Sequence, residues 1–173
     1  MKAGKKRPKK GGKTISACHF LWLAKAEALA KKPVRRGGSP HPSVRVGAIF
    51  VDAGGHEIAA AANRFARGVK ARVPERLDTN GRSLWINCAE QLAIVEAARR
   101  KADLKGARLY VTLEPCAICA GLIAEMGIRE VFVPAQSLRH SSRLKKKWKS
   151  SIDIGLVKLA EAGVKVRAVD VKK

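Results

Sequence analysis

The chain has 173 residues, 46% of them hydrophobic, and a formal net charge of +22 at pH 7. This length suits a single domain with one core, and no apolar run approaches the roughly 20 residues of a membrane-spanning helix. The first residues are basic and no apolar signal segment follows them, so the sequence argues against a membrane protein and against a secreted one.

The first third of the chain predicts a tail, a helix and a hairpin. Residues 1–13 hold seven of the 36 Lys and Arg residues among Gly and Pro, which predicts a disordered basic tail before a folded domain at 14–173. Apolar residues at helical spacing predict an amphipathic helix over 15–31. A Pro- and Gly-rich loop then precedes a hairpin, whose predicted strands are 44–51 and 57–62.

The rest of the chain alternates helices and strands. Residues 63–84 are polar and rich in Arg, and they are long for a loop inside a compact domain, which indicates a functional or disordered segment. Asn87 is positioned to cap the next helix. Beyond it we expect helices over 88–101, 116–126 and 152–161 and strands over 107–113, 130–133 and 164–169. The pattern predicts an α/β fold, a single mixed sheet of about five strands covered by helices on both faces.

A second basic cluster lies at residues 139–149. Trp148 stands there among Arg139, Arg143, Lys145, Lys146, Lys147 and Lys149. A field of this sign attracts nucleotide phosphates or nucleic acid, and an aromatic ring among lysines can stack on bases. A solvated basic surface, or a loop whose Trp packs on the core, explains the cluster equally well, so these interpretations stay open.

Three cysteines and one glutamate form the most informative pattern, in the segments Asn87-Cys88-Ala89-Glu90 and Glu114-Pro115-Cys116-Ala117-Ile118-Cys119. Three thiolates suit one tetrahedral Zn²⁺ and leave an open position, where a water is acidified from a pKa of about 15.7 to about 7. Glu90 is placed to shuttle the proton of that water. Three Cys ligands with a separate Glu are typical of zinc-dependent nucleobase deaminases. We therefore expect Cys88, Cys116 and Cys119 to bind Zn²⁺ and Glu90 to be catalytic in a hydrolytic deamination.

Both segments fall at predicted helix starts. Cys116 and Cys119 are three residues apart and share a helix face, and the free N–H groups and the dipole of a helix start stabilise thiolates. The residues between Cys88 and Cys116 are enough for a helix, a turn and a strand. We therefore expect the second helix to start beside the first, at the edge of the sheet where open α/β folds bind ligands.

The alternatives are a structural zinc site and buried, inert thiols. A structural site needs a fourth ligand, which Cys18 or a histidine would have to supply. The pairing of one Cys with one Cys-x-x-Cys, and a Glu without a structural task, favour the catalytic site. We expect Cys18 to be a core thiol rather than a ligand. Because the cysteines leave no pairs for a disulfide framework, we expect a reducing, cytoplasmic location.

From about His19 to Val133 the sequence resembles the zinc-dependent cytidine/deoxycytidylate deaminase superfamily, and within it the deoxycytidylate (dCMP) deaminases. Besides the cysteine segments, the resemblance lies in Val46-Gly47-Ala48, Asn63-Arg64-Phe65-Ala66-Arg67-Gly68, Pro74-Glu75-Arg76 and Leu109-Tyr110-Val111-Thr112. The chain departs from dCMP deaminases at Cys88, where they usually have His, and its Cys-Ala-Glu form is commoner in free-nucleoside and blasticidin-type deaminases. The resemblance implies a three-layer α/β/α fold, a Zn²⁺ cofactor and a homo-oligomer.

The resemblance also implies residue roles. A zinc-held hydroxide attacks C4 of a cytosine ring, while Glu90 protonates N3 and then the leaving amine. The backbone N–H of Ala89 binds the ring O2, and Asn63 binds the sugar or the base edge. Arg67 binds the 5′-phosphate, with Arg64 and Arg76 as alternatives. We therefore expect a dCMP-like nucleotide to be converted to a dUMP-like nucleotide and ammonia.

Two other functions fit the basic charge. One is deamination of a base within single-stranded DNA or RNA, flipped into the pocket, and the other is a basic nucleic-acid-binding protein whose zinc is structural. The salt dependence separates the first from a mononucleotide deaminase, because binding of a polymer weakens steeply with salt. A fourth protein ligand on the zinc would indicate the nucleic-acid-binding protein with structural zinc.

Overall fold

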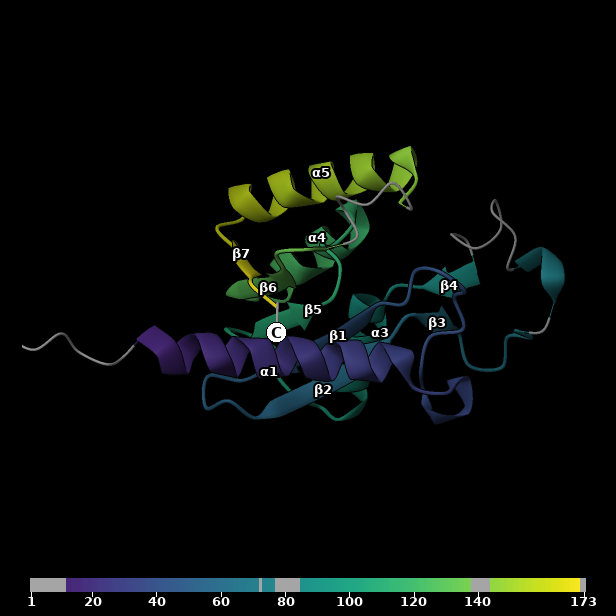
Figure 1. Ribbon diagram of the computed structural model, residues 1–173, viewed down its shortest axis with the longest axis horizontal. Helices are drawn as coiled ribbons and strands as arrows, with labels where there is room; N and C mark the ends of the chain where they lie inside the picture. Colours follow the sequence, from purple (N-terminus) through teal and green to yellow (C-terminus); the bar gives the residue numbers. More distant parts are fainter. Residues whose placement is uncertain (1–11, 72, 77–84, 138–143, 172–173) are drawn as a thin grey trace, which may run out of the picture.

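The computed structural model describes residues 12–71, 73–76, 85–137 and 144–171, and it arranges them in three layers (Figure 1). One face of a central sheet carries the long helix α1 (Gly12–Lys31). The opposite face carries three helices, which are α3 (Ala89–Arg99), α4 (Ala117–Glu125) and α5 (Lys146–Glu161). Two short 3₁₀ turns, η1 (Val34–Arg36) and η2 (Pro74–Arg76), lie in the loops.

The central sheet has five strands of mixed direction. Their spatial order is β2 (Glu57–Ala62), β1 (Gly47–Val51), β5 (Arg108–Val111), β6 (Glu130–Pro134) and β7 (Lys165–Val169). Strand β1 runs antiparallel to β2 and β5, whereas β5, β6 and β7 are parallel. Parallel neighbours need crossover connections, and α4 and α5 supply them. The prediction of one mixed sheet with helices on both faces is confirmed.

The alternation of side chains along β1 divides the core into two layers. Ile49 and Val51 join the cluster that packs under α1, while Ala48 and Phe50 join the larger cluster under the other three helices. Successive side chains of a strand point to opposite faces. Because both faces of β1 are covered, all five of its residues are buried, and the site elements stand on a rigid sheet.

Some helix and strand boundaries differ from the prediction. Strand β1 begins at Gly47 rather than at residue 44, because the side chain of Asn63 binds the backbone of the preceding residues. Its Nδ2 donates to the carbonyl of Val44 at 3.0 Å, and its Oδ1 accepts from the N–H of Val46 at 2.8 Å. Helix α1 begins at Gly12 rather than at residue 15, and α5 begins at Lys146 rather than at residue 152.

A two-stranded ribbon, β3 (Arg64–Phe65) with β4 (Ile86–Asn87), closes part of the predicted 63–84 loop. Strands of two residues carry no periodic signal in a sequence. The ribbon brings Asn87 into β4, so the prediction that Asn87 caps the next helix is wrong, and Cys88 is the N-cap. Outside the described part of the chain lie most of the predicted tail (1–11), residues 72 and 77–84 of this loop, and Arg139 and Arg143 of the basic cluster.

The prediction that Cys18 is a core thiol is also wrong, because Cys18 is exposed. The buried stripe of α1 consists of Leu23, Ala26 and Ala30. Leu23 is five positions after Cys18, so at 3.6 residues per turn the two residues lie about 140° apart around the helix.

Across the described ranges, every helix is too short or too polar to span a lipid bilayer.

Glu130, at the start of β6, is buried among three arginines. Its carboxylate accepts a hydrogen bond from Arg167 Nε at 2.8 Å, and the Nε atoms of Arg108 and Arg129 lie 3.7 and 3.9 Å from it. Burial raises the pKa of Glu130, but the three guanidinium groups together outweigh it and hold the pKa below its usual value. A depressed carboxyl pKa stabilises the folded state above the unfolded value of about 4.3 and loses that contribution as the pH falls through the folded value.

We expect Glu130→Gln to lower the free energy of unfolding at pH 7 by about 1–2 kcal/mol, since a hydrogen bond to a charged group is lost. Urea unfolding at pH 7 and at about pH 3 measures the effect. The difference between the wild type and the variant should shrink toward the lower pH, because the wild-type carboxyl takes up a proton as the pH falls through its folded pKa, which lies below the usual value. An equal difference at both pH values would show that packing, not charge, is responsible.

Candidate active site

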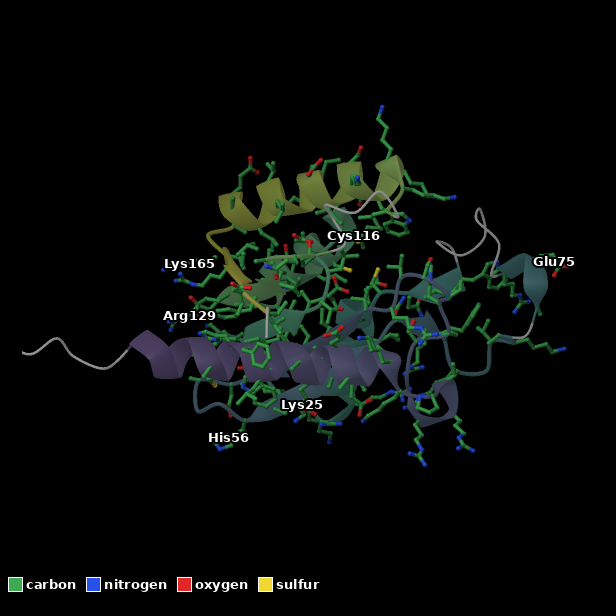
Figure 2. All side chains as sticks on the ribbon, viewed as in Figure 1. Lys25, His56, Glu75, Cys116, Arg129 and Lys165 are labelled. Atoms are coloured by element: carbon green, nitrogen blue, oxygen red, sulfur yellow. The ribbon has the colours of Figure 1, made fainter. Side chains whose placement is uncertain are left out.

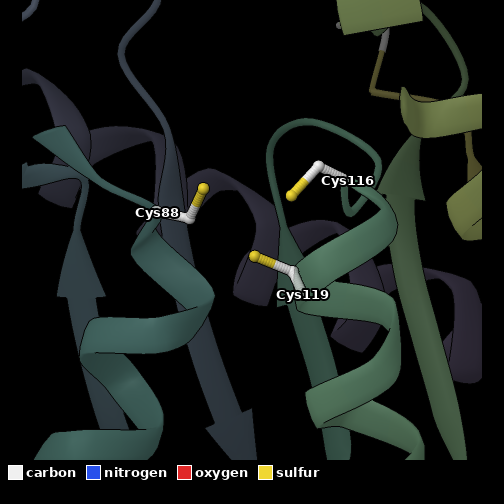
Figure 3. A group of neighbouring side chains, drawn as sticks. All are labelled: Cys88, Cys116 and Cys119. Carbon is white, nitrogen blue, oxygen red and sulfur yellow. The ribbon is translucent and has the colours of Figure 1, made fainter. Parts of the chain in front are cut away.

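Three thiols meet where two helices begin (Figure 3). Cys88 is the N-cap of α3, Cys116 is the N-cap of α4, and Cys119 lies in the first turn of α4. Their sulfur atoms all lie within 4.8 Å of one another. The prediction that the two helices start side by side is confirmed, and the ends of the neighbouring strands β1, β2 and β5 flank the same edge.

The three thiols are held together by shared protons, and one divalent metal ion could take the place of these protons. The pKa of Cys116 is lowered by hydrogen bonds from the thiols of Cys119 and Cys88 and from the backbone N–H groups of Cys119 and Ile118. As donors in these bonds, and because burial disfavours their thiolates, Cys88 and Cys119 have raised pKa values. A metal ion that binds all three removes this conflict, since it takes the place of the shared protons.

The donor set fits Zn²⁺. Zinc–sulfur bonds of about 2.3 Å put the sulfur atoms of a tetrahedral site roughly 3.8 Å apart, which the sulfur cluster reaches with small adjustments. Among the residues that the structure describes, no other His, Cys, Asp or Glu joins the cluster. Three ligands are the number that a catalytic zinc site takes from the protein.

Glu90 lies in the first turn of α3 and is only 4% exposed. Burial raises the pKa of its carboxyl to about 7, and the negative charge of the nearby Cys116 thiolate adds to the rise. The adjacent Gln91 also has a structural task, because its Oε1 accepts a hydrogen bond from the Cys88 backbone N–H at 3.1 Å. The start of α3 therefore fixes one thiol and one buried carboxyl beside each other.

Helix α5 holds the start of α4 in place. Ser151 Oγ accepts a hydrogen bond from the Ala117 N–H at 3.2 Å, and Lys158 Nζ donates to the Ala117 carbonyl at 3.2 Å. Gly155 faces the same segment so closely that a Cβ there would lie 2.5 Å from the Pro115 carbonyl oxygen and 3.1 Å from that of Cys116. In Figure 2, Cys116 accordingly lies just beneath α5. The supporting residues Ser151, Gly155 and Lys158 lie outside the cysteine and glutamate motif from which the site was predicted.

Cys88, Cys116 and Glu90 line a pocket of about 130 Å³. A cavity that holds a single water molecule needs roughly 10–15 Å³, so this pocket has room for a small planar ring. Its other walls come from the loop before β1, the ends of the ribbon and of β5, and the first residues of α5. These walls contain His41, Ser43, Val44, Val46, Asn63, Ile86, Asn87, Ala89, Leu113, Glu114, Leu144, Lys145, Trp148 and Ile152.

Two of the three residues predicted to bind substrate line this pocket, namely Asn63 and Ala89. Asn63 is buried, and its amide already holds Val44 and Val46. Arg67 is exposed and is not among the lining residues. The roles of these three residues stay predictions.

The alternative arginines make other contacts. Arg64 Nη1 donates to the Phe65 carbonyl at 3.4 Å. Arg76 donates to the Lys70 carbonyl at 2.8 Å, and its guanidinium stacks 4.0 Å from the ring centre of Trp85. Neither arginine is among the described residues that line the pocket.

The sequence did not predict that the start of α5 forms a wall of the pocket. The cluster of Lys residues around Trp148 was the feature that could have indicated this wall.

The chain is similar to known deaminases. The family model described as the cytidine and deoxycytidylate deaminase zinc-binding region matches residues 21–135. A tRNA-specific adenosine deaminase of Aquifex aeolicus (strain VF5) is 36% identical over 124 residues, which cover 70% of this chain and 68% of that protein. The deoxycytidylate deaminase of Enterobacteria phage T2 is 49% identical over 43 residues, which cover 25% of this chain and 23% of the phage protein.

Among solved structures, the dCMP deaminase from the cyanophage S-TIM5, in complex with dCMP and dUMP, has the same fold. It matches with a TM-score of 0.62 at 21% sequence identity, over 94% of this chain and 99% of that one. The matched family region includes every residue of the thiol cluster and Glu90, so Zn²⁺ is the cofactor that the cluster fits. The chain belongs to the cytidine and deoxycytidylate deaminase family.

Proposed function

We propose that the protein is a zinc-dependent hydrolytic deaminase of a cytosine nucleotide, converting a dCMP-like substrate to a dUMP-like product and ammonia. The observation that carries the proposal is the buried Glu90 carboxyl beside three converging thiols, two of which line a pocket together with it. A structural zinc site has no use for such a carboxyl, and it needs a fourth ligand.

The residues of the chain divide the work as follows. Cys88, Cys116 and Cys119 would hold Zn²⁺, which as a Lewis acid would make a water molecule nucleophilic near neutral pH. Glu90 accepts one proton of the attacking water and passes it to ring N3, then takes the second proton from the new hydroxyl at C4 and delivers it to the departing amine; a carboxyl pKa near 7 suits both transfers. Ala89 presents a first-turn backbone N–H, which has no partner within the helix, to the ring O2.

The nucleotide substrate has support in the similarity to the phage T2 deoxycytidylate deaminase and in the pocket size. A base within nucleic acid is the second candidate. Its support is the longer match to a tRNA-specific adenosine deaminase and the basic start of α5 at the pocket wall. We favour the free nucleotide because segments 63–68 and 74–76 resemble the dCMP deaminases, which is a more specific signal than positive charge.

Ammonia release by the zinc-loaded chain tests the proposal. The substrates are dCMP, CMP, deoxycytidine, cytidine, adenosine, guanine and a cytosine-containing single strand. We expect dCMP to be the best substrate, with a rate that depends little on salt. Turnover of the strand alone, with a steep loss between 50 and 200 mM salt, would contradict the nucleotide proposal and establish the nucleic-acid one.

Three further predictions from the sequence accompany this proposal. They are a homo-oligomer, binding of nucleic acid by the basic surface and a cytoplasmic location. The first has support in three exposed apolar side chains on α3 and α4, since subunit contacts cover surface of this kind. These side chains are Val95, Ile118 and Leu122.

A further inference from the structure

Lys145 is the one Lys or Arg among the described residues that line the pocket. We propose that Lys145 binds the phosphate of the nucleotide substrate and that the neighbouring Trp148 contacts its sugar or base. The N-terminal end of α5 then selects a phosphorylated substrate over the free nucleoside. This inference rests on the proposed function and names the phosphate site that Arg67 was expected to provide.

The position of Lys145 suits a ligand that enters from solvent. Lys145 is the N-cap of α5 and is exposed, whereas Trp148 is half-buried and packs on the core while it also lines the pocket. Leu144, before Lys145, is buried and lines the pocket too. The wall is therefore anchored by apolar contacts on both sides of Lys145, and the ammonium group projects from a fixed backbone.

The charges in the pocket place a phosphate at this end and not at the floor. Glu90 and Glu114 line the floor, and with Zn²⁺ bound the three thiolates of the cluster would exceed the charge of the metal ion. Both carboxylate oxygens of Glu114 accept a hydrogen bond from Ser137 Oγ, at 2.8 and 2.7 Å. An anion is repelled from this floor and attracted to Lys145, where the dipole of α5 adds positive potential.

His41 does not replace Lys145 as the cation. Its Nδ1 accepts hydrogen bonds from the backbone N–H groups of Val44 at 2.8 Å and Ser43 at 3.2 Å. A ring nitrogen that accepts carries no proton, so the proton of the imidazole is on Nε2 and the ring is neutral. His41 therefore contributes shape to the wall, and the positive charge there is that of Lys145.

The test compares Lys145→Gln with the matched control Lys146→Gln. The control removes the same charge from the next residue, whose side chain does not line the pocket. For Lys145→Gln we expect kcat/KM for dCMP to fall about ten- to a hundredfold, as for one lost charge-assisted hydrogen bond. The kcat/KM for deoxycytidine should stay the same. Lys146→Gln should leave the preference for dCMP over deoxycytidine unchanged.

Product binding gives a second measurement that does not depend on turnover. Quenching of tryptophan fluorescence by dUMP and by deoxyuridine gives the two dissociation constants, and Lys145→Gln should weaken only the binding of dUMP. Equal effects of the two lysine variants, or an equal loss for nucleotide and nucleoside, overturn the phosphate site even if dCMP is deaminated. If the wild type deaminates no cytosine compound in the panel, the proposed function itself fails.

Discussion

Glu90→Gln should reduce turnover by about 10²–10⁴-fold while the protein keeps its zinc. An amide has the shape of the carboxyl but cannot accept the proton of water or return it to the ring, and general acid–base catalysis contributes about 10²–10⁴-fold. The side chain is buried at the pocket floor, so the neutral amide also avoids the cost of burying a charge. The fold and the thiol cluster should therefore be unchanged.

Metal analysis and ammonia release on the same samples check this prediction. The control is Glu125→Gln, which removes an exposed carboxylate at the end of α4 and should leave both values unchanged. Retained turnover in Glu90→Gln would rule out Glu90 as the proton shuttle. Loss of zinc from this variant would instead show that the carboxyl supports the metal site.

The meeting of the three cysteines at two helix starts, with Glu90 in the first turn of one of them, was predictable because these positions are set by local structure. Cys88 and Cys116 each stand at a helix start, and Cys119 follows within the first turn of the same helix. Spacing along one helix translates directly into spacing in space. The parallel part of the sheet was predictable for a similar reason, since strands that alternate with helices pair in this way.

The supports of the site were not predictable, because they depend on contacts between distant segments. The side chain of Ser151 bonds to the backbone of Ala117, and Gly155 touches the backbone of Pro115 and Cys116. A Gly inside a helix is read from sequence as a weak helix position. In the same way, Asn63 was read only as a substrate ligand, although its amide holds the segment before β1.

Gly155→Ala should destabilise the protein and weaken zinc binding, although Ala is the better helix former. Helix propensity alone favours Ala over Gly by about 0.5–1 kcal/mol. The new Cβ, however, would lie 2.5 Å from the Pro115 carbonyl oxygen, and the atoms in its way are backbone atoms that cannot rotate aside. Overpacking costs about 1–3 kcal/mol, so we expect a net loss in the free energy of unfolding.

The displaced segment carries a metal ligand, so the clash should reach the zinc site. Moving α5 away or pushing Cys116 aside alters the support of the ligand, and changes of this kind typically cost 10–100-fold in metal affinity. Competition with a chromophoric chelator measures the zinc dissociation constant, and thermal unfolding with and without zinc measures stability. Ser151→Ala, which removes one acceptor without adding bulk, should weaken zinc binding in the same direction but less.

Gly121→Ala is the matched control, because it makes the same substitution within α4, the helix that carries Cys119. A Cβ at Gly121 would meet only the end of the flexible Lys158 side chain, at 4.0 Å. This variant should be as stable as the wild type or more stable, by up to about 1 kcal/mol, and should bind zinc equally well. If Gly155→Ala behaves like Gly121→Ala, the close contact with Pro115 and Cys116 does not hold the metal ligand, and the fixed geometry of the site must come from α3 and α4 alone.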